Sequence, residues 1–180
     1  MFVKPWPALI VLAVFLGGCS AMQPKDFEGT QPHLDLFAYF QGETHAWGIF
    51  QDRSGSLQRQ FTVAIKGEVE DDELTLTEDF VYADGETQQR IWRIHRIDQH
   101  RYEGRADDVV GTATGLAYGQ ALNWRYTMRL PYRGTEINVV FDDWMFLQAD
   151  DVLVNRATVS KFGFKVGEVT LFFTKGGPSA

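Results

Sequence analysis

The chain has 180 residues, a formal net charge of −7 and a single cysteine, Cys19. The acidic balance, with no cluster of Lys or Arg, argues against nucleic acid as a partner, and the lone cysteine excludes a disulfide within the chain. The length fits one domain with a full hydrophobic core.

Residues 1–18 have the pattern of a signal peptide. Lys4 supplies a positive charge near the start, and residues 8–16 form an apolar run of nine residues, too short to span a bilayer as a stable helix. The residues Leu16-Gly17-Gly18-Cys19 resemble the lipobox of bacterial lipoproteins. This pattern predicts cleavage before Cys19 and acylation of its thiol. The alternative is an ordinary secreted protein with an incidental thiol.

The residue after the cysteine bears on location. Ser20, rather than Asp, follows Cys19, and in the sorting signals of such lipoproteins this choice favours the outer membrane. Acyl chains on Cys19 would anchor the protein effectively permanently. Because an acidic surface is repelled by anionic lipid, we expect membrane contact through this anchor rather than through the domain face. The expected location is the periplasmic face of the outer membrane.

The segment that follows is polar. Residues 19–32 are rich in turn formers and lack an apolar period, which predicts a lipidated N-terminus and a flexible tether. In "HLDLFAYF", Leu34, Phe37 and Ala38 fall at helical spacing, so a short helix is expected to lead into the domain. The domain itself is assigned to residues 33–180.

Beyond this point the chain alternates apolar and polar residues with the period of a β-strand. "ALNWRYTMRL" is the clearest case, because its apolar side chains share one face and its Asn, Thr and Arg side chains share the other. "SLQRQFTVAI" and "LTLTEDFVY" follow the same pattern. We expect nine or ten strands in all.

Turn signals separate these strands at short intervals. They are Ser54-Gly55, Asp84-Gly85, Arg133-Gly134 and Val166-Gly167. Such pairs tolerate the positive φ angles of tight hairpin turns, so consecutive strands should be antiparallel neighbours. No segment is long enough to serve as the helical crossover of a parallel sheet.

A meander of this length must protect its edge strands, and closure into a barrel removes the edges. Gly111, Gly115 and Gly119 recur every four residues, which places all three on one face of one predicted strand. Glycine at such positions permits the coiling and close approach that a barrel needs. The predicted fold is therefore all-β: a single antiparallel up-and-down barrel, similar to lipocalins and other calycins.

Several long segments, in order, resemble one family. They are "AWGIFQDRSGSLQRQF", "LTEDFVYADGETQQRIWRI", "GTATGLAYGQALNWRYTMRLP" and "FDDWMFLQADDVLVNRATVSKFGFKVGEVTLFF", together with the lipobox. They are similar to the DUF3833 family of bacterial lipoproteins, over about residues 37–173. The resemblance implies a periplasmic, lipocalin-like domain and supplies no catalytic residues. A small apolar ligand in the barrel follows only from fold analogy.

The usual signatures of catalysis are missing from the sequence. No serine lies in a Gly-x-Ser-x-Gly elbow, and the four histidines do not have metal-ligand spacing. The sequence therefore predicts neither a metal site nor a cofactor. His45 and His95 are the candidate bases that distant strands could bring together.

Asp142 and Asp143 stand apart from the other three Asp-Asp pairs, which lie in or beside turns, because this pair lies within a predicted strand. Adjacent strand residues point to opposite faces, so one carboxylate should face solvent and the other the barrel. An inward Asp is costly unless it is paired. The candidate partners are Arg125, Arg129, Arg156, Lys161, Arg90 and Arg93. We expect an internal salt bridge that fixes the register; a polar group at the base of a ligand pocket is the alternative.

Three functions follow as hypotheses. The first is a non-enzymatic barrel that binds a lipid or other lipophilic molecule, lined by Phe61, Trp92, Trp124, Tyr126 and Phe141, with Arg125 as a polar group. The second is a lipid-modifying enzyme that uses Asp142 or Asp143 with His45 or His95 as an acid/base pair. The third is an interaction or structural protein of the envelope that uses an exposed apolar patch.

Overall fold

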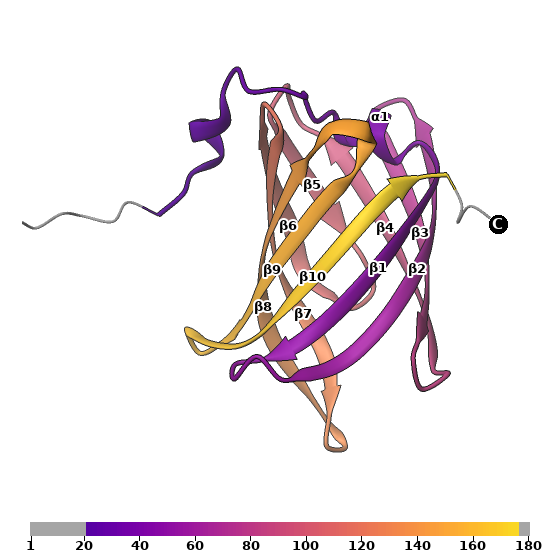
Figure 1. Cartoon of the computed structure of the whole chain (residues 1–180), viewed down its shortest axis with the longest axis vertical. Coiled ribbons are helices and arrows are strands. Elements are labelled where there is room, and N and C mark those ends of the chain that lie inside the picture. Colours follow the sequence, from indigo (N-terminus) through magenta and orange to yellow (C-terminus); the bar gives the residue numbers. More distant parts are fainter. Residues whose placement is uncertain (1–20, 177–180) are drawn as a thin grey trace, which may run out of the picture.

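The computed structural model describes residues 21–176 and shows a closed antiparallel barrel of ten strands (Figure 1). Each strand pairs with the next one in the chain, and the first pairs with the last. The strands are β1 (Gly42–Asp52), β2 (Leu57–Glu70), β3 (Glu73–Tyr82), β4 (Thr87–Arg96), β5 (Arg101–Arg105), β6 (Val109–Tyr118), β7 (Ala121–Tyr132), β8 (Thr135–Leu147), β9 (Leu153–Lys161) and β10 (Phe164–Lys175). The predicted up-and-down barrel is confirmed and is consistent with a lipocalin-like architecture.

The side chains alternate across the barrel wall as their sequence pattern predicts. In β7, Leu122, Trp124 and Met128 are buried, whereas Arg125 and Arg129 are exposed. Since β7 pairs with β8 over its whole length, the alternation of the two strands is in phase. The inner faces of the strands form the core, and the charged side chains of the wall lie mostly outside.

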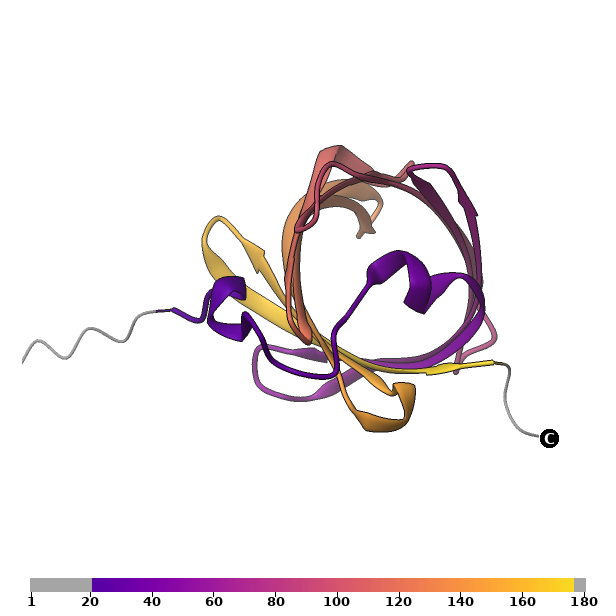
Figure 2. The ribbon, with the colours of Figure 1, turned by 90° about the horizontal axis from the view of Figure 1, so that it is seen from above.

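A short helix closes one end of the barrel. Helix α1 (Leu36–Phe40) lies across the opening in Figure 2. Asp35 caps its start by accepting hydrogen bonds from the backbone N–H groups of Phe37 and Ala38, at 2.9 and 3.1 Å. The predicted helix is confirmed, but its buried side chains are Leu36, Phe37, Tyr39 and Phe40, while Ala38 is exposed.

The three glycines predicted to share one face of a strand do not do so. Gly111 has φ +76° beside a break in the β6–β7 register, and Gly119 lies in the turn between these strands with φ +52°. Only Gly115 faces the interior, where the Trp124 ring lies directly against it. The bulge shifts the alternation, so equal spacing in the sequence does not give equal orientation.

Most of the predicted turn signals fall at hairpins, with one exception. The last turn lies at Phe162 and Gly163, which have φ +51° and +81°. Val166 and Gly167 instead lie inside β10, where the β9–β10 register shifts. A sequence with no Asn or Asp at this turn offered no clear signal for it.

The segment predicted to be a flexible tether is partly docked on the barrel. The 3-10 helix η1 (Pro24–Phe27) places the Phe27 ring 6.1 Å from Trp144 and 5.5 Å from Phe146, centroid to centroid, on the outer face of β8. The Leu34 N–H then donates to the Gly119 carbonyl at 2.8 Å. The predicted signal peptide and Cys19 lie outside the described residues. None of the helices within residues 21–176 is long and apolar enough to cross a membrane.

Candidate functional site

The barrel is hollow. Its interior holds a cavity of about 1030 Å3, at the upper end of the range usual for ligand sites. Leu36 and Phe40 of α1 line the closed end, whereas Tyr132 and Lys161, from hairpins at the opposite end, line the mouth. The helix therefore makes the cavity a one-ended pocket.

Aromatic rings form much of the wall. Phe61, Trp92, Trp124, Tyr126 and Phe141, the five aromatic residues predicted to line a pocket, all contribute to it. The Trp92 ring meets Trp124 and Tyr126 edge to face, with centroids 5.8 and 5.4 Å away, and Tyr126 stacks on Phe141 at 5.0 Å. The structure thus places these residues where the sequence predicted; their part in binding stays a prediction.

Arg125 does not belong to the pocket. Its side chain lies on the outer face of β7 and forms an ion pair with Asp142. The structure does not bring Arg125 to the cavity wall where we expected it, because its neighbour Trp124 occupies the inward position of the strand.

Asp142 and Asp143 point to opposite sides of the wall, as predicted. The outward Asp142 accepts hydrogen bonds from Arg125 and from the Asn123 amide, the latter at 2.7 Å. Burial alone would raise the pKa of Asp142, but these two donors outweigh it and hold the pKa below its ordinary value. Asp142 is therefore part of a wall contact and not of the cavity.

The inward Asp143 is 6% exposed and lines the cavity. Its Oδ1 accepts a hydrogen bond from the Asn155 side-chain amide at 2.9 Å. Burial raises the pKa of Asp143 to about 6, although Asn155 and the Tyr126 hydroxyl both favour the charged form. Asp143 is thus a carboxylate in an apolar pocket that titrates near neutral pH.

The internal salt bridge expected for the inward Asp is not formed. No Lys, Arg or His in residues 21–176 lies within 4 Å of the Asp143 carboxylate. Arg129 and Arg156 share the outward phase of Asp142, so the strand geometry that turns Asp143 inward turns these cations away. An amide, Asn155, takes the place that we had expected an arginine to fill.

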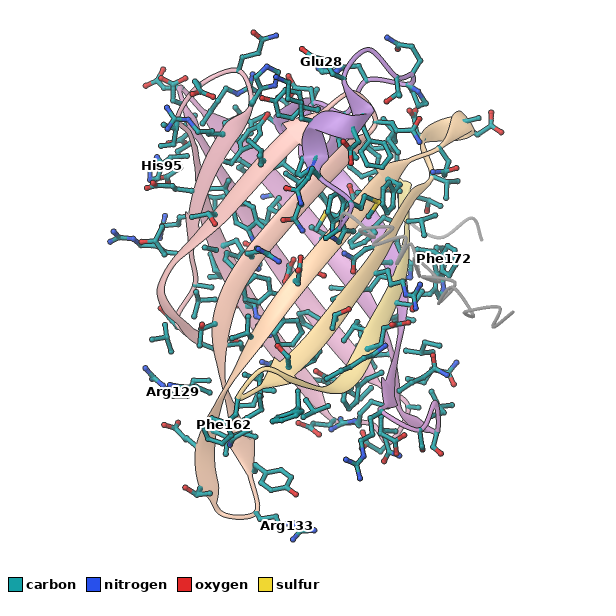
Figure 3. The ribbon with its side chains drawn as sticks, turned by 90° about the vertical axis from the view of Figure 1, so that its left-hand side faces the viewer. Glu28, His95, Arg129, Arg133, Phe162 and Phe172 are labelled. Atoms are coloured by element: carbon teal, nitrogen blue, oxygen red, sulfur yellow. The ribbon has the colours of Figure 1, made fainter. Side chains whose placement is uncertain are left out.

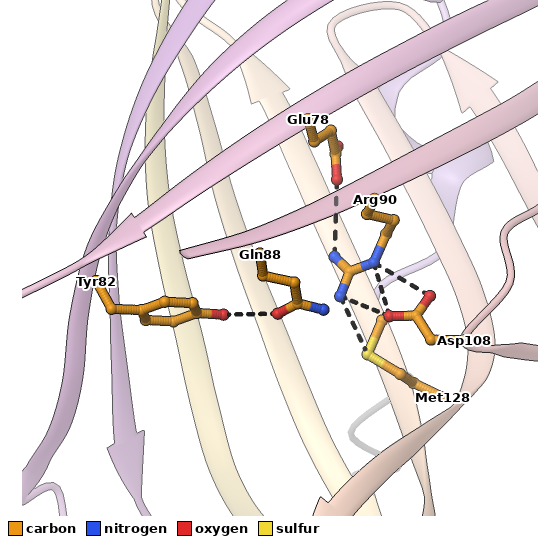
Figure 4. A network of polar contacts seen from close by, with 6 residues as sticks. All are labelled: Glu78, Tyr82, Gln88, Arg90, Asp108 and Met128. Carbon is orange, nitrogen blue, oxygen red and sulfur yellow. Dashed lines mark hydrogen bonds and ion pairs between the residues drawn. The ribbon is translucent and has the colours of Figure 1, made fainter. Parts of the chain in front are cut away.

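A second polar group lies on the cavity wall around Arg90 (Figure 4). The Arg90 guanidinium donates to both oxygens of Asp108, at 2.9 and 3.2 Å from Nε, and lies 3.6 Å from a Glu78 oxygen. It also contacts the Met128 sulfur at 3.6 Å and covers the Phe80 ring. One guanidinium thus serves two carboxylates.

The charge of this cluster depends on pH. Burial raises the pKa of Glu78 to about 7; Arg90 opposes this shift, and the carboxylates of Asp108 and Asp143 add to it. The guanidinium stays charged because its two acidic neighbours outweigh the cost of its burial. Glu78 is therefore the second cavity carboxylate that titrates near neutrality.

Sequence reasoning overlooked this cluster, although a signal for it exists. Glu78 interrupts the apolar face of "LTLTEDFVY", and Arg90 is its direct register partner on β4. An acidic residue on the buried face of one strand, opposite a basic residue on the next, predicts an internal pair. Its position in the sequence alone predicts Arg90 only as a distant partner of the Asp pair.

The structure does not assemble the proposed acid/base pair. His45 lies on the outer face of β1 with its ring 4.6 Å from that of Trp47. His95, on the outside of β4 (Figure 3), places Nε2 3.1 Å from Glu73. None of the four histidines, all within residues 21–176, lines the cavity, and the barrel wall separates His45 and His95 from Asp143. The described residues also contain no group of three His, Cys, Asp or Glu suited to a metal ion.

Comparison with known proteins completes the description of the chain. No curated protein matches it. A family model described as "Protein of unknown function (DUF3833)" matches residues 13–175, which includes every strand of the barrel. The chain therefore belongs to the DUF3833 family.

Proposed function

We propose that this barrel binds a lipophilic small molecule in its internal cavity. The observation that carries the proposal is the cavity itself, which is deep, aromatic-walled and closed at one end by α1. Burial of apolar ligand surface there contributes about 25 cal/mol per Å2. A barrel whose only task was structural would be expected to fill this volume with its own side chains.

The polar groups on the wall limit what a ligand can place beside them. Asp143 has an amide partner and no cation, and Arg90 is already held between Asp108 and Glu78. A ligand group that reaches Asp143 must therefore donate a hydrogen bond, as an amine, amide or hydroxyl does. A free carboxylate would meet like charge in a low-dielectric site. We propose an apolar body with a donor group, rather than a fatty-acid anion at this position.

Uptake of an apolar fluorescent probe by the purified protein, followed by native mass spectrometry, tests the proposal. Val169 lines the cavity, so Val169→Trp should fill part of it and weaken uptake. The matched control is Val140→Trp, because Val140 is exposed on the outer face of β8. Equal uptake by the wild type and Val169→Trp, or no uptake from a panel of neutral and cationic amphiphiles, would remove the proposal.

We also propose that the protein is held at a bacterial membrane through acylated Cys19. The support is the leader pattern and the lipobox that ends in this cysteine. An anchor of this kind would keep the cavity where amphiphiles are abundant. Mass spectrometry of the mature protein should show an N-terminal acylated Cys19, and Cys19→Ser should release the protein from the membrane fraction. An unmodified thiol in the mature protein would contradict this assignment.

A further inference from the structure

The hairpins that surround the mouth of the cavity differ in charge. The β7–β8 and β9–β10 hairpins, residues 129–136 and 161–165, together carry four basic residues and one acidic residue. Two other hairpin tips at this end, residues 83–87 and 106–108, each carry two acidic residues and no basic residue, and the β1–β2 tip, residues 53–56, carries one basic residue, Arg53. On a chain with a net charge of −7, this local basic region is an exception. We call residues 129–136 and 161–165 the basic aromatic rim.

Aromatic side chains stand out from this rim. Phe162 is 89% exposed, Phe164 is 77% exposed and Tyr132 is half exposed. The Lys161 ammonium lies 5.3 Å from the Phe162 ring centroid, and the Arg133 guanidinium lies 5.3 Å from that of Tyr132. Figure 3 shows Phe162 and Arg133 together at the end of the barrel opposite Glu28. Each of the two hairpins thus places a cation beside one of its aromatic rings.

The backbone of the rim gives an independent reason to look for a function. Phe162 has φ +51°, in the left-handed region that bulky side chains rarely adopt and that Asn or Gly adopts readily. Burial of the ring does not offset the cost of this backbone conformation, because the Phe162 side chain is almost fully exposed. Strained positions of this kind gather at functional sites. The fold would be served better by a different residue here.

We propose that the basic aromatic rim docks on the surface of an anionic lipid bilayer. Aromatic rings insert into the interfacial layer, while Lys and Arg beside them meet anionic head groups. This proposal departs from the expectation that the acidic domain face stays away from anionic lipid, because the rim is locally basic and charges farther away than about 10 Å are largely screened at moderate salt. Docking would bring the cavity mouth, which Tyr132 and Lys161 line, directly against lipid. The inference does not depend on the cavity being occupied.

Vesicle flotation tests this proposal. Residues 21–176 contain the closed barrel and its described core, so a chain that starts at Ser20 is suitable and carries no acyl anchor. We expect it to bind vesicles that contain phosphatidylglycerol, to bind phosphatidylcholine vesicles more weakly, and to lose binding at high salt. Failure to bind phosphatidylglycerol vesicles at low salt would overturn the proposal.

Paired variants assign the binding to the rim. The double variant Phe162→Asn and Phe164→Thr should weaken partitioning about tenfold or more, because it removes the inserting rings, while Asn suits the turn and keeps the fold. Arg133→Asn with Lys161→Gln should reduce binding to anionic vesicles alone. The matched control is Trp47→Thr with Phe172→Thr, which removes two rings from the outer wall that are 44% and 50% exposed.

The control should bind as the wild type does. An equal loss of binding in the control and the rim variants would overturn the assignment to the rim. Self-association that the rim variants abolish, in the absence of vesicle binding, would overturn the membrane proposal in favour of a second copy of the chain. Sedimentation velocity measures this outcome directly.

Discussion

The two ends of the barrel are built differently. At the closed end, α1 buries Leu36, Phe37 and Phe40, and the Phe40 ring packs edge to face on Phe173 at 5.8 Å. At the open end, Phe162 and Phe164 bury almost nothing, and the space inside is left unfilled. Phe37 and Phe40 are thus buried at the closed end, whereas Phe162 and Phe164 stand in solvent at the tip of a hairpin at the other end.

This difference distinguishes residues that stabilise the fold, such as those of α1, from residues at the open end that contribute little to stability and are available for function. A protein that needed only a stable barrel would pack both ends as it packs the first. The cavity extends from α1 to the end that α1 leaves open, and the exposed rim surrounds that open end. The two ends should therefore differ in what a substitution costs in stability, as their contacts differ.

The largest loss of stability is expected when the buried Phe40 ring at the closed end is removed. Phe40→Ala should lower the free energy of unfolding by about 3 to 5 kcal/mol, because it leaves a void between α1 and the barrel. Phe162→Ala at the open end should change it by no more than about 0.5 kcal/mol. Urea unfolding followed by tryptophan fluorescence measures both. Similar losses of stability in the two variants would contradict the difference between the closed and open ends.

A smaller effect is expected from the carboxylate inside the cavity. The pKa of Asp143 is raised from its ordinary 3.8 to about 6, so the folded state binds more protons than the unfolded state between these values. The free energy of unfolding should therefore fall as the pH rises from about 4 to 6, by roughly 2 to 3 kcal/mol from this group.

Asp143→Asn should remove that part of the pH dependence. Glu78, whose pKa is raised to about 7, adds a dependence of the same sign that continues toward neutral pH, so some slope should remain in the variant. Unfolding curves at a series of pH values measure the difference. If the stability of the wild type rose between about pH 4 and 6, this would contradict the conclusion that Asp143 is buried without enough partners to stabilise its charge.

Of the two neighbouring carboxylates, Asp142 on the outer wall should have the smaller effect on stability. Asp142 has a lowered pKa, so its contribution is present above pH 3.8 and is lost as the pH falls through the lowered value, the opposite sign to Asp143. Because the Asp142–Arg125 pair is partly exposed and screened, Asp142→Asn should cost no more than about 1 kcal/mol at neutral pH. A larger loss for Asp142→Asn than for Phe40→Ala would reverse the expected order.

Much of the fold could be predicted because alternation is a local property. In β7 the inward and outward residues can be assigned without knowledge of any other strand, and the aromatic lining of the cavity follows from that alternation. The same rule placed Asp142 and Asp143 on opposite sides of the wall. It failed at Gly111, where a bulge shifts the phase, and it missed the turn at Phe162 and Gly163, where a bulky residue holds the first positive-φ position in place of the usual Asn, Asp or Gly.

The partners of the inward charges could not be predicted in the same way. A cation that meets an inward carboxylate must itself lie at an inward position at the right height on a neighbouring strand, and this depends on the register of the pairing. Arg125 and Arg129 lie on the strand next to that of Asp143, but their side chains point outward and cannot reach it. Arg90 had the right phase, and the register brings it to Glu78 and Asp108 instead.

The sequence by itself determined an antiparallel barrel and the side of the wall on which most residues lie. Only the tertiary structure decided that the barrel is hollow, that α1 closes one end and that Asp143 lies in the cavity without an ion pair. The physical reason is that alternation acts between neighbouring residues. The volume left inside a closed sheet depends on all ten strands together.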